Sequence, residues 1–299
     1  MNRKLIFFIN PISGTRAKAK VPEIIQQLTS AQGLPFGILH TNAAGDYAYL
    51  IDKINSENIT DVIICGGDGT VNQLANALLG VDVNIGIVPM GSGNGLAFAA
   101  GIPKQIEKAL AVVYKGQAMA VDSFYINGRF SCMLCGLGFD AQVAHDFAKQ
   151  NKRGLATYVK QSTRNFFRAK AYPFTLEVNG KQVSSDAYFI SIANSNQFGN
   201  NFTIAPKASL HDGLLDIVVV NKMNKMRLVW SILRQIRMGK VKPYEDQQRY
   251  RNSIHYFQTD HLSIGNPQGA PLHIDGDPAD TSSSFEIKII KSAFRLLMP

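Results

Sequence analysis

The sequence contains few cysteines, and those present do not indicate a disulfide framework or a metal centre. Cys65, Cys132 and Cys135 are an odd number in a chain of 299 residues, which argues against a set of disulfides. Cys132 and Cys135 form a lone C-x-x-C with no second Cys or His pair nearby, and the six histidines lack ligand spacing. We therefore expect core cysteines and no zinc site.

Long apolar runs are also missing. No stretch approaches the roughly 18 apolar residues that a membrane-spanning helix needs. The start of the chain imitates a signal peptide, but its apolar run covers only Leu5 to Ile9 before Asn10-Pro11, which is too short. We therefore expect a cytoplasmic protein.

Acidic residues are outnumbered by basic ones, 22 to 31, which gives a formal net charge of +9 and a pI near 9.4. This balance favours an anionic partner, such as a nucleotide, a nucleic acid or an anionic membrane surface. The content of 45% hydrophobic and 18% charged residues is typical of a globular protein, and the length allows one large domain or two.

Strand and helix patterns alternate over the first 120 residues. Apolar strands are expected at 3–10, 36–41, 61–67 and 84–91, with helical stripes around 21–28, 46–55, 71–78 and 103–116. Repeated units of this kind predict a doubly wound α/β domain with a parallel sheet. Ligands of such sheets bind outside the carboxyl ends of the strands.

The pattern changes near Val121. Asn127-Gly128 and Asn179-Gly180 each stand between strand-like residues, which is a strong hairpin signal. We expect an antiparallel β-sandwich with helical insertions near 143–169 and 223–238. The predicted domains are residues 1–122, rejoined by the C-terminal segment 290–299, and residues 123–289.

Glycine-rich loops follow several of the expected strands. A buried strand runs into Gly66-Gly67-Asp68-Gly69-Thr70, and a helical stripe begins at Val71. Such a loop lets a ligand approach the backbone and directs helix N–H groups at an anion, although an ordinary tight turn is the alternative. The loops at 91–95 and 10–14 have the same position after a strand, and Thr41 would lie beside them.

Two acidic motifs occur in the second half. Asp212-Gly213 precedes a strand that contains Asp216. This Asp-Gly pair forms either a turn or a hard-cation site with oxygen ligands. Further on, three acids lie within six residues, at Asp275, Asp277 and Asp280. They form either a solvated turn or a site where one carboxylate deprotonates an acceptor hydroxyl.

Two segments, 149–172 and 222–242, mix Lys and Arg with apolar or aromatic residues at helical spacing. Core packing with solvated basic flanks is one interpretation. An amphipathic surface that contacts an anionic membrane is the other, and both can hold for the same helix.

The ordered motifs resemble those of the diacylglycerol kinase catalytic-domain family, and in particular its bacterial soluble lipid kinases. The motifs are NPISG at 10–14, GGDGTVN at 66–72, GSGN at 91–94, GLGFDA at 136–141, DGLLD at 212–216 and DGDP at 275–278. GGDGT alone also occurs in NAD kinases and phosphofructokinases, whereas the combination is more specific. The resemblance covers nearly the whole chain and implies a nucleotide-binding α/β domain followed by a β-sandwich.

The resemblance also implies roles for individual residues. Asp68 would help to organise magnesium and the phosphates, and Asp212 with the carbonyls of Ser209 and Leu214 would form a structural magnesium site. The late motif of the family is usually D-G-E, with Glu as the base on the lipid hydroxyl, and Asp277 stands at that position here. The residues implied for the ATP site are Asn10, Pro11, Ile12, Ser13, Gly14, Thr41, Gly66, Gly67, Asp68, Gly69, Thr70, Val71, Asn72 and Ser92.

The implied activity is transfer of the γ-phosphoryl group of ATP, with magnesium, to a hydroxyl of a membrane lipid such as diacylglycerol. The GSGNGLA segment is closer to sphingosine kinases than to bacterial glycerolipid kinases, so a sphingoid base is an alternative acceptor. A kinase for a soluble acceptor, similar to NAD kinase, and an inactive nucleotide-binding regulator are further alternatives. The expected partner is lipid at the inner, anionic membrane face, and a homodimer is allowed for. No nucleic acid is expected, because the β half has no R-G-F or G-x-x-G surface.

Overall fold

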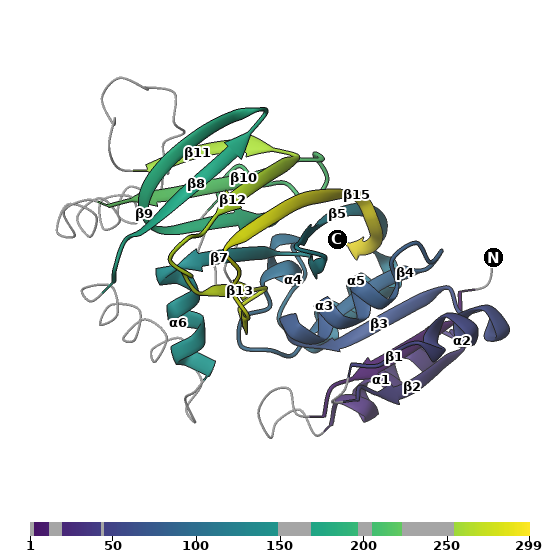
Figure 1. The fold of residues 1–299 in the computed structure, drawn as a ribbon. Helices are drawn as coiled ribbons and strands as arrows, with labels where there is room; N and C mark the ends of the chain where they lie inside the picture. The colour runs from purple at the N-terminus through teal and green to yellow at the C-terminus, as the bar shows by residue number, and fades with distance from the viewer. Residues whose placement is uncertain (1–2, 12–19, 43–44, 149–168, 197–204, 223–253) are drawn as a thin grey trace.

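The architecture comes from a computed structural model, which describes residues 3–11, 20–42, 45–148, 169–196, 205–222 and 254–299. The N-terminal part is an α/β unit, and the rest of the described chain is mainly antiparallel sheet (Figure 1). One mixed sheet runs through both parts. The predicted fold class, a doubly wound α/β domain followed by a β-sandwich, is confirmed.

The parallel sheet has the strand order β4-β3-β1-β2. All side chains of β1 and β3 are buried, as expected for central strands with helices on both faces, whereas the edge strand β2 is partly exposed. The strands are β1 (Leu5–Ile9), β2 (Phe36–His40), β3 (Asp61–Gly66) and β4 (Asn84–Pro89). The helices are α1 (Val21–Ala31), α2 (Tyr49–Glu57), α3 (Asp68–Ala77), α4 (Gly95–Ala99) and α5 (Ile106–Lys115).

The register brings the glycine-rich loops together at one edge of this sheet. Ile9 pairs with Cys65, and Cys65 pairs with Val88, so three strands end at the same level. The N–H of Asn10 donates to the carbonyl of Cys65 at 2.9 Å, and that of Met90 to the carbonyl of Gly66 at 2.7 Å. The loops after β1, β3 and β4 therefore adjoin.

The second part has its own apolar core, which is built mainly from side chains of its antiparallel strands. Helix α6 (Phe139–Ala148) contacts β7, β13 and β14. The strands are β5 (Gln117–Ile126), β6 (Arg129–Ser131), β7 (Leu134–Gly138), β8 (Tyr172–Val178), β9 (Lys181–Ala193), β10 (Leu215–Asn221), β11 (Ile254–Thr259), β12 (His261–Gly265), β13 (Leu272–Ile274), β14 (Asp277–Ala279) and β15 (Ser284–Met298).

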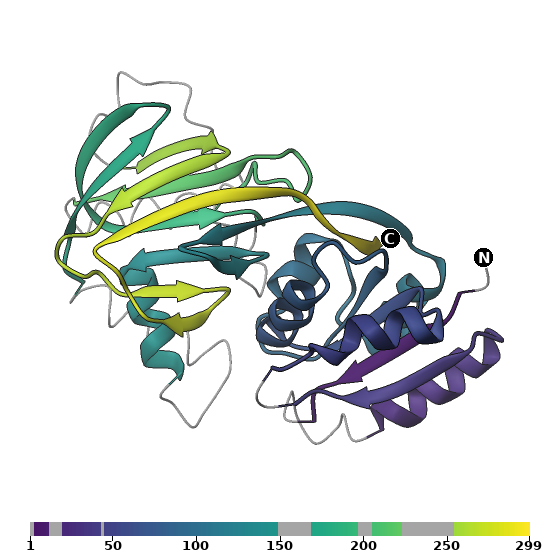
Figure 2. The same ribbon diagram turned by 45° about the vertical axis from the view of Figure 1, so that its right-hand side comes forward.

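Two long strands, β5 and β15, run from one part of the molecule to the other (Figure 2). The end of β15 pairs in parallel with β4, at Arg295 and Leu296. A register shift interrupts the β5–β15 pairing around Ser292, whose φ is +51° and whose N–H donates to the buried Asp122 carboxylate at 2.7 Å. The predicted domain limits at 122 and 290 fall inside these two strands and remain a prediction.

The two Asn-Gly hairpins are confirmed. Asn127 and Gly128 join β5 to β6, and Asn179 and Gly180 join β8 to β9, with positive φ at every position, as a type I′ turn requires. Of the predicted helical insertions, α6 begins the first, while 149–168 and 223–253 lie outside the described residues. Within the described chain, none of the helices has the length and apolar character needed to cross a bilayer.

Candidate active site

The loops after β3 and β4 are packed directly against each other. A Cβ atom built on Gly91 would lie 2.6 Å from the Cα of Gly67, so this contact requires glycine. Asn94, at φ +57°, fixes the second loop, since its Oδ1 accepts the N–H of Gly91 and its Nδ2 donates to the Gly91 carbonyl, both at 2.8 Å. Each loop therefore determines the position of the other.

Other glycines of the first loop also have protein neighbours. A Cβ on Gly66 would lie 2.7 Å from the Cβ of Thr70, and one on Gly69 would lie 2.8 Å from Oδ2 of Asp277. Close packing within the protein thus explains part of the glycine content that we attributed to a ligand. The expected ligand contact stays a prediction.

Asp68 is the first residue of α3, and its carboxylate reaches the start of α4. Oδ2 accepts the N–H of Asn94 at 2.7 Å, and Oδ1 accepts the N–H of Gly95 at 2.8 Å. Burial, together with the nearby charges of Asp275 and Asp277, raises the pKa of Asp68 to about 7, against the effect of the two N–H donors. The site therefore concentrates negative charge.

The predicted ATP-site residues that the structure describes gather at the carboxyl ends of the strands. Asn10 Nδ2 donates to Thr70 Oγ1 at 2.8 Å, and the N–H of Thr41 donates to the carbonyl of Ile9 at 3.1 Å. Ser92 is exposed on the second glycine loop, whereas Val71, on α3, is buried in the core. Residues 12–19, which include the predicted Ile12, Ser13 and Gly14, lie outside the described residues.

The three acids of the DGDP region have different environments. Asp275 is buried, with φ +48°, and forms with Gly276 a two-residue turn between β13 and β14. Its carboxylate accepts hydrogen bonds from six groups: Asn72 Nδ2 (2.7 Å), Ser131 Oγ (2.6 Å), Cys132 Sγ (3.5 Å) and the N–H groups of Cys132 (3.1 Å), Met133 (3.1 Å) and Leu134 (3.0 Å). Asp275 therefore holds the turn in place.

Asn72 joins this network from α3. Its Nδ2 donates both to Asp275 and to the carbonyl of Phe130, the latter at 3.0 Å. Asn72 was predicted to bind ATP, and the structure shows that its amide group connects the nucleotide-side helix to the DGDP turn. The sequence analysis missed this connection, and the only local signal for it was the Asp-Gly dipeptide.

Asp277, the predicted base, follows the turn and lies on its exposed side. Its Oδ2 lies beside Gly69, at the start of α3. Asp280 is directed elsewhere, since its side chain is 95% exposed and pairs with Arg129 at 3.4 Å. Of the three acids, Asp277 thus lies at Gly69 of the first glycine-rich loop, while Asp68 lies close to Gly93 of the second.

The predicted second-domain metal site is more open. Asp212 is exposed, and its Oδ1 accepts the N–H of Leu214 at 3.1 Å, while the N–H of His211 reaches Ser209 Oγ at 3.4 Å. Asp216 is fully buried and accepts a hydrogen bond from the Tyr256 hydroxyl. Burial raises the pKa of Asp216 to about 6, against a hydrogen bond from Gln258.

Neither acidic site contains a ready-made cage of side chains. Among the described residues, no three His, Cys, Asp or Glu side chains converge as a metal site. Magnesium commonly takes only one or two carboxylates and completes its shell with phosphates and water. Asp68 and Asp277 fit that mode, and Asp212 fits a site completed by backbone carbonyls.

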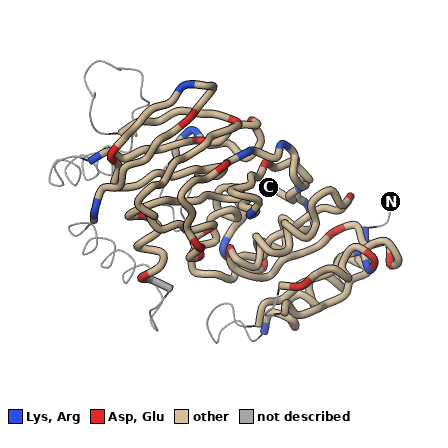
Figure 3. Tube along the Cα trace, viewed as in Figure 1, with Lys and Arg blue, Asp and Glu red and all other residues tan. Residues whose placement is uncertain are grey.

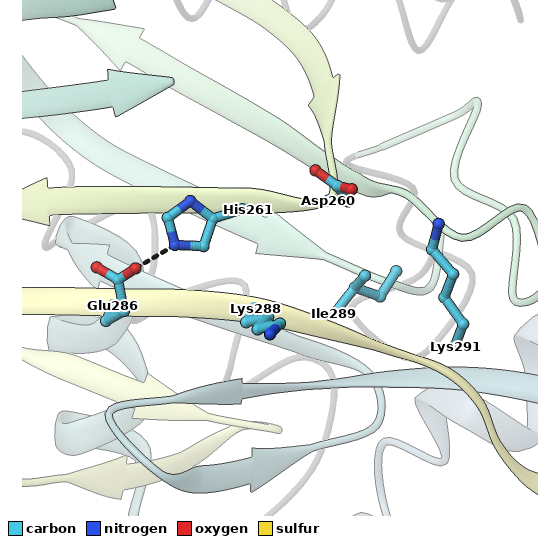
Figure 4. Close-up of a pocket in the computed structure, with 6 residues that line it drawn as sticks. All are labelled: Asp260, His261, Glu286, Lys288, Ile289 and Lys291. Atoms are coloured by element: carbon cyan, nitrogen blue, oxygen red, sulfur yellow. Dashed lines mark hydrogen bonds and ion pairs between the residues drawn. The ribbon is translucent and has the colours of Figure 1, made fainter. Parts of the chain in front are cut away.

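A surface pocket of about 600 Å³ lies on the sandwich, between β12 and β15 (Figure 4). A hydrogen bond joins His261 to Glu286 across it. The residues that line it are Asp260, His261, Glu286, Lys288, Ile289 and Lys291. No predicted site residue is among them.

The described residues leave the predicted membrane contact untested. Figure 3 shows Lys and Arg positions spread over several elements in this view. The two basic-apolar segments predicted at 149–172 and 222–242 lie almost wholly outside the described residues. Membrane contact therefore stays a prediction.

Comparison with known proteins identifies two family models. Residues 4–126 match the diacylglycerol kinase catalytic domain, and residues 134–297 match the YegS C-terminal NAD kinase beta sandwich-like domain. A "Probable lipid kinase YegS-like" from Enterobacter sp. (strain 638) is 29% identical, over 85% of this chain and 83% of that protein. A protein of the same name from Citrobacter koseri is 27% identical, over 90% of this chain and 88% of its own.

The solved structures agree in fold. A diacylglycerol kinase structure from Bacillus anthracis (strain Sterne) superimposes with a TM-score of 0.75, at 19% identity, over 100% of this chain and 97% of that one. At this identity the likeness concerns the fold alone. The two family models, however, cover nearly the whole chain, and the second alone covers more than half of it. The chain therefore belongs to the diacylglycerol kinase catalytic-domain family of lipid kinases.

Proposed function

We propose that this kinase transfers the γ-phosphoryl group of ATP to a hydroxyl of a membrane lipid such as diacylglycerol, with magnesium. The observation that carries the proposal is the position of Asp277, whose Oδ2 lies beside Gly69 of the GGDGT loop. An acid that can take a proton from an acceptor hydroxyl thus adjoins the loop that would hold the phosphates.

The start of α3 would bind the phosphates. Gly67 is the N-cap of this ten-residue helix, and the N–H groups of the first turn have no partner within the helix. These groups and the helix dipole favour an anion. Thr70, held by Asn10, and the exposed Ser92 would add hydroxyl donors beside them.

Asp68 and Asp277 would then have different roles in the transfer. Asp68 would hold the nucleotide's cation, because its carboxylate lies in a region whose other acids raise its pKa. Magnesium bound there would neutralise charge on the phosphates during an in-line transfer. Asp277 would accept the proton of the attacking hydroxyl. The turn that Asp275 fixes would keep the Asp277 carboxylate beside Gly69.

The lipid would enter from an anionic membrane surface, to which the net charge of +9 would attract the protein. Asp212, with the carbonyls of Ser209 and Leu214, would bind a second magnesium that stabilises the sandwich. A sphingoid base is a second candidate acceptor, supported by the GSGNGLA segment at 91–97. A homodimer would be compatible with either acceptor.

The test is transfer of labelled γ-phosphate from ATP in mixed micelles. Diacylglycerol, monoacylglycerol, phosphatidylglycerol and a sphingoid base are offered in parallel, with NAD as a soluble acceptor. We expect label in one lipid class, lost in Asp277→Asn and kept in Asp280→Asn. Label in NAD alone, or ATP binding with no transfer to any lipid, would overturn the proposal.

A further inference from the structure

A buried histidine lies directly behind the turn that carries Asp277. His273 is 1% exposed, and its Nδ1 accepts the N–H of Gly276 at 3.2 Å. Its Nε2 lies 3.1 Å from Oδ2 of Asp140. A ring nitrogen that accepts a hydrogen bond carries no proton, so Nε2 bears the hydrogen and donates it to Asp140.

The chain leaves space for this pair by means of a glycine. His273 pairs with Gly136 across β13 and β7. A Cβ on Gly136 would lie 2.2 Å from Oδ2 of Asp140 and 2.4 Å from Nε2 of His273. Any other residue at 136 would therefore separate the two side chains. Gly136 and Asp140 belong to the GLGFDA motif, to which neither the sequence nor the proposed reaction gives a role.

Helix α6 holds β13 at two neighbouring residues. Asp140, in the first turn of the helix, binds His273, and one turn later His145 donates from Nε2 to the carbonyl of Leu272 at 2.8 Å. Figure 1 shows α6 beside β13, on the side away from the parallel sheet. The helix thus supports the strand that leads into the turn.

The turn is consequently held on both of its residues. Asp275 is fixed through its carboxylate by Asn72 and the β6–β7 segment, and Gly276, at φ +88°, is fixed through its N–H by His273. Asp277 follows immediately, and its direction depends on the peptide planes of these two residues. We propose that His273, oriented by Asp140, is a positioning residue that keeps the carboxylate of Asp277 at the phosphate loop. This inference rests on the proposed role of Asp277 as base.

Core packing alone makes a different prediction from positioning. If His273 only fills space, any side chain of similar size should serve. If it positions Asp277, the acceptor at Nδ1 is the essential group. Two substitutions separate these roles. In His273→Asn, the amide oxygen Oδ1 takes the place of Nδ1 as acceptor, but the shorter side chain cannot reach Asp140. In His273→Gln, the amide nitrogen Nε2 keeps the donor to Asp140, but the acceptor for Gly276 is lost.

The experiment compares kcat, KM for ATP and amide hydrogen exchange of Gly276 in the full-length protein and both variants. We expect His273→Asn to stay within about fivefold of the wild-type kcat, because the acceptor is kept. We expect His273→Gln to lose about 10²-fold in kcat, with KM for ATP unchanged and exchange at Gly276 accelerated, since misplacement by about 1 Å has such effects. Urea unfolding of both variants identifies any loss of the fold.

Equal activity of both variants, or equal loss of activity with exchange at Gly276 unchanged, would overturn the inference. The proposed function fails separately, if the wild-type protein transfers no phosphate to any lipid. Exchange at Gly276 then decides alone whether His273 holds the turn: acceleration in His273→Gln but not in His273→Asn supports it, and any other pattern contradicts it.

Discussion

The two ends of β3 each carry an aspartate, and the two carboxylates have opposite surroundings. Asp61 is the first residue of the strand, at the amino edge of the parallel sheet. Asp68 stands just past its last residue, at the carboxyl edge. One strand thus places the same residue type at both edges, and only the second edge adjoins the glycine-rich loops.

At the amino edge, the charge is neutralised by the protein. Asp61 is fully buried, and Arg3 donates to both of its oxygens, at 2.9 and 3.0 Å. Thr60 and Asn84 add hydrogen bonds, and Arg3 also caps the carbonyls of Val113 and Tyr114 at the end of α5. Such a bidentate, hydrogen-bonded pair connects the N-terminus, β3 and α5.

At the carboxyl edge, the nearest charges have the same sign. Among the described residues, Asp68 accepts hydrogen bonds from the N–H groups of Asn94 and Gly95, and none of the ion pairs joins it to Lys or Arg. Asp275 and Asp277 raise its pKa. The fold therefore neutralises Asp61, whose buried charge would otherwise destabilise the protein. It leaves Asp68, at the edge where a cation or phosphate would bind, without a positive partner among the described residues.

The largest expected effect is on catalysis at the carboxyl edge. Asp277→Asn removes the proposed base without changing the size of the side chain, and we expect kcat to fall by about 10²- to 10⁴-fold. The free energy of unfolding in urea should stay close to that of the wild-type protein, because Asp277 is exposed. Asp277→Glu, which introduces the usual residue of the family, should keep kcat within about tenfold. An active Asp277→Asn would exclude this residue as the base.

The next effect concerns stability at the amino edge. Arg3→Ala leaves the Asp61 charge buried and unpaired, and we expect a loss of about 3 kcal/mol in the free energy of unfolding. The kcat of the folded protein should not change, because this pair lies at the opposite end of β3 from Asp68. Urea denaturation and steady-state kinetics measure the two quantities, and Arg3→Lys, which keeps the charge but loses the bidentate contact, is the matched control. Unchanged stability in Arg3→Ala would contradict the contrast between the two edges.

The pH dependence of stability should reveal the unneutralised charge directly. The pKa of Asp68 is about 7 in the folded protein and about 3.9 in an unfolded chain, so the folded state binds the proton more tightly. The contribution of Asp68 to the free energy of unfolding is therefore fully present below pH 4 and is lost as the pH rises through 7. The loss is on the order of 1 kcal/mol after allowance for solvent screening. Asp216, whose pKa is about 6, contributes with the same sign.

Urea unfolding at several pH values, in the presence of a chelator, compares wild type with Asp68→Asn. The decrease in the free energy of unfolding between pH 4 and 7 should be smaller in Asp68→Asn than in the wild-type protein, and smaller still in the double variant Asp68→Asn/Asp216→Asn. If the wild-type protein instead gained stability relative to Asp68→Asn between pH 4 and 7, the pH dependence would have the opposite sign and would contradict a raised pKa of Asp68.

The sequence was sufficient for features that depend on local pattern. The alternation of strands and helices predicted the parallel sheet, and each Asn-Gly pair predicted its hairpin, because positive φ at both positions is a local requirement. Position after a strand also sufficed to bring the loops at Asn10, Gly66 and Gly91 to one edge, since parallel strands end together.

The remaining features depend on contacts between distant residues. Asp275 and Asp277 look alike in the sequence, and contacts with distant residues, among them Asn72, 203 residues earlier, and Ser131, distinguish the buried acid from the one at the loop. The close approach of His273 to Gly136 likewise depends on residues that lie far apart in the sequence. The family resemblance assigned Asn72 to the ATP site, and a sequence motif cannot show that this amide group binds the β13–β14 turn.

The smallest expected effect tests whether position or charge alone makes the carboxyl edge functional. Asp280 lies three residues from Asp277 on the same hairpin region, but its side chain is 95% exposed and pairs with a half-exposed Arg129. Asp280→Asn removes the same charge as Asp277→Asn. We expect kcat to change less than about twofold and the free energy of unfolding by less than about 0.5 kcal/mol, as for other exposed substitutions. If Asp280→Asn lowered kcat as strongly as Asp277→Asn, the net negative charge of the hairpin would explain both results, and the placement of Asp277 beside Gly69 would lose its significance.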